Sequence, residues 1–368
     1  MYLNEHSVIN FRNIESISFT PETGVNVVFG QNGQGKTNLL ESIFLLTGAK
    51  SFRARKDSEL IKTGEEYCVI DSLFFLDERR QRIKITVSDK GRTAQRNRGS
   101  EVKAASLVGV FCCVLFSPEH LMLIKGSPEQ RRRFIDTALC QISPKYLIEL
   151  KRYTRIVQQK NSALKNAYRT DNIDEILDVY DAQLSEAARV VTYMRKQFCD
   201  SLILPAKEDY FSISGRSEAL DFQYLSTLFK AEEMTAKEGY DNYLKNRTTD
   251  IRAGFSTLGP HRDDLYVTIN GENARTYSSQ GQQRTAVLAL KLAEASVMEK
   301  SLGEKPVLLL DDVLSELDGS RQDFLLGRLN DGQAIITSCD PLLISSRVHS
   351  SLFEMKDGRL TDRQQGRT

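Results

Sequence analysis

Gly30-Gln31-Asn32-Gly33-Gln34-Gly35-Lys36-Thr37 matches the phosphate-loop pattern G-x-x-x-x-G-K-[ST]. The glycines allow the backbone to turn its N–H groups inward around phosphate oxygens. An apolar, β-branched run precedes the loop at 24–29 and helical spacing follows it from Thr37, so a helix N-terminus faces the same anion. We expect Lys36 to reach the β- and γ-phosphates of ATP and the Thr37 hydroxyl to bind Mg²⁺. The alternative, a glycine-rich turn, is disfavoured by this order of strand, loop and helix.

A second, acidic element supports a nucleotide site. The apolar run 307–310 is typical of a buried strand, and it ends in Asp311 and Asp312. We expect Asp311 to hold the Mg²⁺ shell and Asp312 to orient or deprotonate the attacking water, so Asp312 and Lys36 are the predicted catalytic residues. Paired aspartates that merely cap the next element are the alternative.

A third element resembles the signature of ABC-type ATPases. Ser279, Gly281 and Gln282 match the Leu-Ser-Gly-Gly-Gln signature and precede a helix-like segment. The resemblance implies that they bind the γ-phosphate held by a second subunit, an anion at a helix N-terminus with a hydroxyl donor. A polar turn with an N-cap is the alternative. Ser315-Glu316-Leu317-Asp318 is similar to the D-loop that ABC dimers pack across their interface, with Ser315 and Asp318 as its matching residues.

The pattern along the chain predicts an α/β fold, an ABC-type P-loop ATPase head built from both chain ends with a helical insertion lobe. Residues 1–144 are expected to form the N-terminal part of the head, including antiparallel strands between 69 and 87. Residues 145–255 show helical spacing, interrupted only by Pro205, which we interpret as a turn. Residues 256–368 return to strands and complete the head.

The net charge of +1 hides a segregation of charge along the sequence. Nine Lys or Arg against two acids lie between Arg79 and Lys103, and seven against one lie between Lys145 and Arg169. Such patches suit phosphate-backbone binding, and solvated faces balanced in three dimensions are the alternative. The candidate DNA contacts are Arg82, Lys84, Lys90, Arg92, Arg96 and Arg98.

The composition is that of an ordinary globular protein, with 40% hydrophobic and 27% charged residues. No apolar run approaches the roughly 20 residues of a membrane helix, and the first residues lack a signal-peptide pattern. The expected location is therefore the cytoplasm, with no membrane partner. The six cysteines form no CxxC pair, so we expect neither disulfides nor a structural zinc.

The chain resembles the RecF family in several further segments. They are Asn10-Phe11-Arg12-Asn13, Lys50-Ser51-Phe52-Arg53, Phe116-Ser117-Pro118-Glu119, Arg131-Arg132-Arg133-Phe134-Ile135-Asp136 and Gly259-Pro260-His261. The resemblance covers both chain ends, and the insertion matches in length more than in motif. It implies an ATP-dependent homodimer that recognises gapped or single-strand/double-strand junction DNA in replication and repair. It also implies work with RecR and RecO to help load RecA onto single-stranded DNA.

Two departures from the ABC pattern favour slow hydrolysis, suited to a switch. No histidine follows the run 334–337, where Ser338-Cys339-Asp340 stands, and Ser117 stands where a glutamine loop would begin. By resemblance to related chromosome-handling ATPases, Arg12 is a candidate ATP contact, with a surface salt bridge as the alternative. His261 and Arg262 either contact DNA or fix their turn, and we favour the turn.

Two other classes of protein remain as alternatives. The ATP-binding subunit of a transporter is disfavoured by the helical insertion of about 110 residues before the signature and by the basic strands. A chromosome-organising ATPase with a long coiled coil would need hundreds of heptad residues, and this insertion offers at most a short hairpin.

Overall fold

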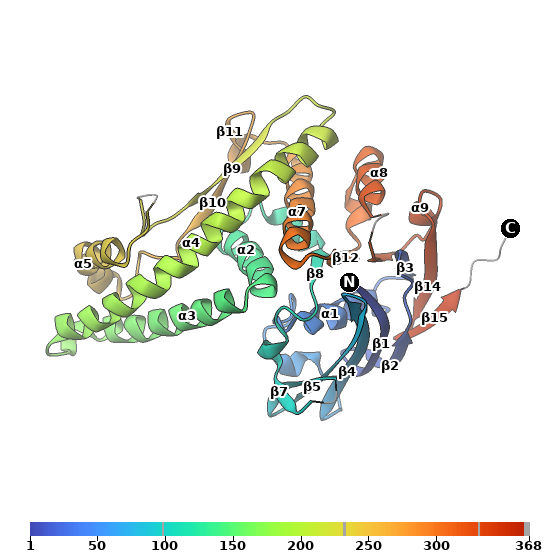
Figure 1. Cartoon of the computed structure of the whole chain (residues 1–368), viewed down its shortest axis with the longest axis horizontal. Helices are drawn as coiled ribbons and strands as arrows, with labels where there is room; N and C mark the ends of the chain where they lie inside the picture. Colours follow the sequence, from blue (N-terminus) through green and yellow to red (C-terminus); the bar gives the residue numbers. More distant parts are fainter. Residues whose placement is uncertain (98, 231–232, 330–331, 364–368) are drawn as a thin grey trace.

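The computed structural model describes residues 1–97, 99–230, 233–329 and 332–363. The chain forms a head (residues 1–117 and 303–363) and an elongated arm (residues 118–302), as Figure 1 shows. The head contains two six-stranded sheets, and the arm combines long helices with a three-stranded sheet. The predicted α/β architecture, with a head assembled from both chain ends, is confirmed.

One head sheet carries the nucleotide motifs. Its strands are β3 (Val25–Phe29), β8 (Cys113–Phe116), β12 (Val307–Asp311), β13 (Ala334–Ser338), β14 (Ser350–Lys356) and β15 (Arg359–Arg363). Their order is β15-β14-β3-β13-β12-β8, and every pair except β14–β15 is parallel. Parallel strands buried on both faces read as continuous apolar runs. Because β13 lies between β3 and β12, the segments that follow these three strands leave the sheet at one edge.

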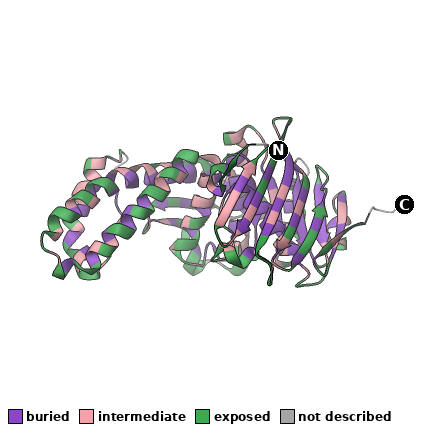
Figure 2. Ribbon diagram, turned by 90° about the horizontal axis from the view of Figure 1, so that it is seen from below, coloured by how far each residue is buried: buried purple, intermediate pink, exposed green. Residues whose placement is uncertain are grey.

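The other head sheet is antiparallel, in the order β2-β1-β4-β5-β6-β7. Its strands are β1 (Tyr2–Phe11), β2 (Ile14–Phe19), β4 (Tyr67–Leu76), β5 (Arg79–Ser88), β6 (Gly91–Arg96) and β7 (Glu101–Lys103). Buried and exposed residues alternate along these strands (Figure 2), as expected of a sheet with one covered face. Helix α1 (Lys36–Phe44) places Leu39, Leu40 and Ile43 in one core that includes residues of both sheets.

The arm is held by its own hydrophobic core. Its helices are α2 (Pro128–Ile142), α3 (Pro144–Lys165), α4 (Ile173–Ile213), α5 (Ala236–Ala253), α6 (Ala274–Tyr277) and α7 (Gln280–Leu302). Its strands are β9 (Leu220–Leu225), β10 (Asp264–Ile269) and β11 (Glu272–Asn273). Lys160 of α3 also bridges Asp181 of α4 and Asp250 of α5, at 2.7 and 2.9 Å, with all three side chains fully buried. Removing one partner of such a buried cluster strongly destabilises the fold, because it leaves a buried charge without compensation.

Two predictions about the insertion were wrong. Pro205 does not mark a turn but lies inside α4. The helix tolerates it because the carbonyl freed four residues earlier belongs to exposed Ser201, where water can replace the lost hydrogen bond. The region 145–255 is also not wholly helical, because it contributes β9, whose alternating burial is set by pairing with β10.

The arm draws on more of the sequence than the predicted insertion. Its core includes residues of α2, β10 and one face of α7, which the boundaries at 144 and 256 assign to the head. Another face of α7, with Leu288, Leu292 and Met298, packs on the parallel sheet beside α8 (Gly319–Arg328), and the short α9 (Leu342–Ser345) also lies there. We therefore propose arm boundaries near residue 118 and at the end of α7, whose two faces join the arm core and the head. No helix among the described residues has the length and apolarity to cross a membrane.

Candidate nucleotide-binding site

The phosphate loop connects β3 to α1 and requires glycine at defined positions. Gly30 and Gly35 have φ angles of 153° and 113°, and a Cβ on Gly30 would lie 2.2 Å from the carbonyl oxygen of Met355. No side chain caps the N-terminus of α1. Its first backbone N–H groups therefore face the loop and are available to an anion.

Lys36 is the buried cation of this loop. Its Nζ donates to the carbonyl oxygens of Gly30 at 2.6 Å and Gln31 at 3.0 Å, and lies 3.6 Å from Cys339 Sγ. Only 7% of the residue is exposed. These contacts hold the ammonium group across the mouth of the loop, where a bound triphosphate can replace the carbonyl partners.

Thr37 and Asp311 come together as a set of oxygen ligands. Thr37 Oγ1 donates to Asp311 Oδ1 at 2.7 Å, and Thr337 Oγ1 donates to the same oxygen at 2.9 Å. A hydroxyl and a carboxylate are the hard ligands that Mg²⁺ prefers, with water and phosphate completing its shell. The residues present therefore fit a Mg²⁺ ion held by Thr37 and Asp311.

Asp312 follows the candidate metal ligand Asp311 and has a left-handed backbone conformation, with φ of 51°. Its backbone N–H donates to Thr337 Oγ1 at 3.0 Å, which fixes the turn after β12. Burial raises the pKa of the Asp312 carboxyl, and the charge of Lys36 opposes that shift. A half-buried carboxylate with a raised pKa suits the predicted role in accepting a proton from water.

Arg12 is turned toward a buried carboxylate and not toward the loop. It donates to both oxygens of Glu41 of α1, at 2.5 and 2.8 Å, and Glu41 is fully buried. Ser51 Oγ donates to the same carboxylate. Arg12 itself has a left-handed backbone, with φ of 52°. The neighbouring Asn13 bonds to the Gly33 carbonyl oxygen at 3.1 Å, so it is Asn13 that touches the phosphate loop in this structure.

The signature residues form the start of α7. Ser279 is the N-cap of this helix, and its Oγ accepts a hydrogen bond from the Gln282 backbone N–H at 3.2 Å. In turn, the Gln282 Oε1 accepts a hydrogen bond from the Ser279 backbone N–H at 2.8 Å. This is a capping box. The Gln282 side chain also donates to Glu218 at 2.7 Å. Among the described residues, no hydrogen bond or ion pair joins Ser279, Gly281 or Gln282 to the phosphate loop of the same chain.

The D-loop residues are tied to the signature helix. Arg284 of α7 donates to the Glu316 carbonyl oxygen at 2.6 Å and pairs with its carboxylate at 2.9 Å. Arg321 pairs with Asp318 and donates to Thr285 Oγ1 at 2.7 Å. Ser315 is exposed and donates to the Asp312 carbonyl oxygen at 2.7 Å. These contacts make the signature and the D-loop one surface, continuous with the carboxylate turn.

The basic strands offer fewer free cations than the sequence predicted. Arg92 is not a candidate for DNA contact, because its side chain is only 9% exposed and donates to the Ala49 carbonyl oxygen. Arg92 faces inward because it pairs with Val87, whose side chain lies on the buried face. Arg82 is exposed but paired with Asp71, and Arg96 bonds to Gln81. The further candidates Lys84 and Lys90 are exposed, and Arg98 lies outside the described residues.

Sequence reasoning missed several residues around the site. Thr337 was not predicted as a site residue, although it donates a hydrogen bond to Asp311. Glu41, which accepts from Arg12, was not predicted either. A carboxylate one turn into an otherwise apolar helix face was the available signal for Glu41. His261 fixes its turn, as favoured, because its ring lies between Tyr153 Oη at 2.5 Å and the Ser256 carbonyl oxygen at 3.0 Å.

Comparisons with known proteins agree with this geometry. The family described as RecF/RecN/SMC N terminal domain matches residues 2–359. Two curated relatives are named DNA replication and repair protein RecF. The one from Clostridium novyi is 37% identical, covering 97% of this chain and 99% of its own. The one from Staphylococcus carnosus is 39% identical, covering 98% and 100%.

Solved structures show the same likeness. A structure of the recombination mediator protein RecF, described as RecF-ATPrS in the RecFOR pathway, has a TM-score of 0.91 and 34% identity, covering 99% of this chain and 98% of its own. An Smc head domain from Pyrococcus furiosus, bound to part of ScpA, has a TM-score of 0.57 and 15% identity, covering 99% and 96%. The latter likeness concerns the fold alone.

Proposed function

Because the chain belongs to the RecF family, we propose that it is an ATP-dependent DNA-binding protein of replication and recombinational repair. The observation that carries the proposal is the convergence of the phosphate loop, Asp311 and Asp312 at one sheet edge, with Thr37 and Asp311 in direct contact. ATP and Mg²⁺ are the ligands that this edge fits. A relative of 34% identity is described with ATP bound.

At the ATP site, each residue has a separate role in the proposed mechanism. The loop N–H groups and Lys36 bind the phosphates, and Mg²⁺, when bound by Thr37 and Asp311, neutralises their charge. Asp312 orients the attacking water and accepts its proton. Neither a histidine after β13 nor a glutamine after β8 assists this step, which supports slow hydrolysis and use of ATP as a switch.

We propose a homodimer because the two elements expected to bind phosphate, the phosphate loop and the signature, do not contact each other among the described residues of one chain. Ser279 presents an exposed hydroxyl at a capped helix start and has no contact with its own phosphate loop among the described residues. We expect the signature surface to bind ATP that is held by a second copy of the chain. The D-loop beside it is also exposed, at Ser315 and Asp318, and so is accessible to that copy. ATP would then hold two heads together.

The DNA substrate and the partners are proposed from the relatives. A relative is called a recombination mediator of the RecFOR pathway. We extend this to gapped or junction DNA as the substrate, RecR and RecO as partners, assistance in loading RecA, and action in the cytoplasm. Exposed cations on the head and the arm support a surface for DNA phosphates.

The test measures dimerisation and DNA binding together. Purified chain is crosslinked with and without ATP, and its affinity is measured for gapped duplex, intact duplex and single strands at fixed salt. We expect ATP to increase the dimer and to favour gapped DNA over intact duplex. Lys36→Ala, which removes the phosphate-facing ammonium group, should lose both effects. DNA affinity that is identical with and without ATP would contradict the proposal.

A further inference from the structure

Helix α3 has two sharply different faces. Tyr146, Tyr153, Ile156, Val157 and Leu164 are buried toward the arm core. At 100° per residue the opposite face presents a row of exposed cations. Lys151, Arg155 and Lys165 lie on this opposite face, and exposed Arg152 and Lys145 flank it. Glu149 is the single acid of α3, and it pairs with Arg152 at 3.6 Å.

Most of these cations have no protein partner. Among the described residues, the side chains of Lys145, Lys151, Arg155 and Lys165 make no hydrogen bond and no ion pair. The head strands differ, since Arg82 is held by Asp71 and Arg92 is buried. An unpaired surface cation keeps solution counterions nearby, and binding to DNA phosphates gains free energy by releasing counterions.

The dimensions of the row match a DNA backbone. A helix of 22 residues is about 33 Å long at 1.5 Å per residue, close to the roughly 34–36 Å of one duplex turn. Exposed Gln158, Gln159 and Ser162 lie between the cations. Amide and hydroxyl groups of this kind donate to phosphate oxygens without reading sequence.

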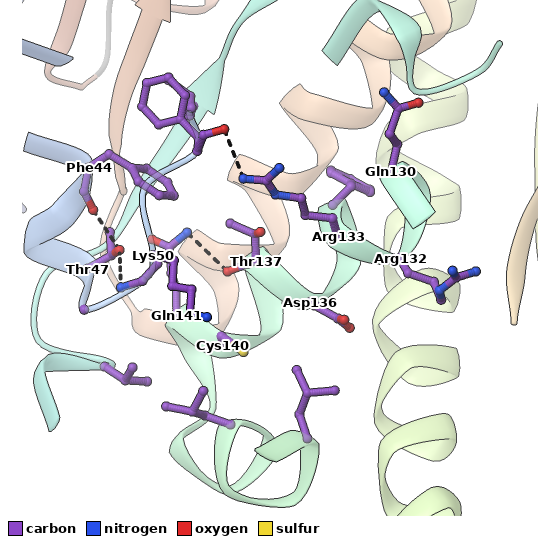
Figure 3. A pocket seen from close by; sticks show the side chains of 18 of the residues that line it. Phe44, Thr47, Lys50, Gln130, Arg132, Arg133, Asp136, Thr137, Cys140 and Gln141 are labelled. Carbon is purple, nitrogen blue, oxygen red and sulfur yellow. Dashed lines mark hydrogen bonds between the residues drawn. The ribbon is translucent and has the colours of Figure 1, made fainter. Parts of the chain in front are cut away.

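The row also continues toward the head. Lys151 lines a cavity of about 710 Å³ that Lys50 and Phe52 of the head also line. Lys50 has no hydrogen bond or ion pair of its side chain among the described residues. Figure 3 shows Arg133 pointing to the Phe44 side of α2, whereas Arg132 and Asp136 point to the other side. Arg133 donates to the Phe52 carbonyl oxygen at 3.0 Å, so α2 and the head loop hold this wall in place.

We propose that the exposed face of α3, named here the α3 row (Lys145, Lys151, Arg152, Arg155 and Lys165), binds the phosphate backbone of duplex DNA, and that Lys50 extends this surface onto the head. The inference rests on the proposed DNA-binding function and adds a site to it. In this arrangement the double-stranded part of the DNA lies against the arm. The proposal concerns the phosphates alone, and contacts to phosphates carry no sequence information directly.

The test is the salt dependence of duplex binding. Lys151, Arg155 and Lys165 are changed together to Gln, which keeps chain length and removes charge. The slope of log K against log salt on duplex should flatten by up to about 2.7, at about 0.9 per lost phosphate contact. A matched control changes Lys237, Lys245 and Arg252, three exposed cations of α5 interspersed with acids, and should leave the slope unchanged. ATP binding and thermal unfolding of both variants should equal those of the unmodified chain.

The outcomes separate this inference from the proposed function. If the unmodified chain shows no salt-dependent binding to any DNA, the proposed function fails. If it binds duplex and the α3 variant keeps the full slope, only the α3 row is overturned, and its cations form a solvated face or contact an acidic protein. Equal flattening by the α5 control would also overturn it, because general charge would then explain the effect.

Discussion

Two adjacent aspartates occupy different environments, and this difference assigns their chemistry. Asp311 accepts from two hydroxyls, those of Thr37 and Thr337, which hold it in position for its proposed role as a Mg²⁺ ligand. Asp312 is half-buried, its pKa is raised by burial, and its side chain is not used by the metal pair. Two neighbouring carboxylates in different surroundings commonly divide roles in this way.

Asp312→Asn should lower ATP hydrolysis by about 10²–10⁴, because it removes a positioned base. ATP should still bind, and an ATP-bound dimer should accumulate. Since the pKa of Asp312 is raised, the base becomes protonated earlier as pH falls. Hydrolysis by the unmodified chain should therefore decline with acidification through that pKa, and the residual rate of Asp312→Asn should not follow this decline. Steady-state rates across pH provide the measurement. Our assignment is wrong if Asp312→Asn keeps full activity while Asp311→Asn abolishes it.

Elements of the head are joined by a buried histidine. His6 of β1 lies 2.7 Å from Ser72 Oγ of β4 through Nδ1 and 2.7 Å from Ser42 Oγ of α1 through Nε2. Burial lowers the pKa of His6 from 6.5 to about 3, opposed by the charge of Asp71. The neutral ring therefore links the antiparallel sheet to the helix that carries Lys36.

The depressed pKa of His6 makes the head sensitive to acid. In the unfolded chain His6 becomes protonated below about pH 6.5, whereas in the folded chain it stays neutral down to about pH 3. The free energy of unfolding therefore decreases as the pH falls from about 6.5 to about 3. At roughly 1.4 kcal/mol per pH unit, His6 accounts for about 2 kcal/mol of lost stability at pH 5. His6→Gln keeps hydrogen-bonding groups and should remove that share of the pH dependence. Urea unfolding at pH 5 and pH 7.5 compares the two chains; equal acid losses would contradict the prediction.

At the scale of the whole molecule, the phosphate loop and the signature lie apart among the described residues of one chain, and the proposed homodimer would bring them together. The phosphate loop and the carboxylates lie at one sheet edge, while the signature caps a helix whose first turn contacts Glu218 and the D-loop. The arm core runs into the same α7. Binding of ATP across two heads would therefore act on the arm through one continuous helix.

Mixing two inactive variants tests this arrangement. Ser279→Arg should leave ATP binding by the monomer nearly intact and block dimerisation, because a bulky cation would disturb the capping box and obstruct the opposing phosphate. Lys36→Ala should also fail to dimerise, because it does not bind ATP. A mixed dimer has one site with both lesions and one with neither, so crosslinked dimer should reappear and peak near equal amounts. A flat yield across mixing ratios, or loss of ATP binding by monomeric Ser279→Arg, would place Ser279 in its own chain's site.

The nucleotide motifs were readable from the amino-acid sequence because their chemistry is local. A phosphate loop needs glycines, a lysine and a hydroxyl within eight residues, and its flanking strand and helix have their own periodicity. Asp311 and Asp312 were found the same way, as polar residues ending an apolar run. The parallel order that brings them beside Thr37 is the usual arrangement of such sheets.

Only the tertiary structure decided which cations are free and which elements share a core. Arg82 and Arg92 look alike in sequence, yet Arg82 pairs with Asp71 of the adjacent strand and Arg92 lies inside, because the exposure of each depends on which residues lie beside it in the folded sheet. Arg12 likewise pairs with Glu41, and Pro205 lies inside α4, where the freed carbonyl of Ser201 faces solvent. Charge and propensity are properties of a residue, whereas desolvation and pairing are properties of its neighbours in space, and those neighbours are set by the folded chain.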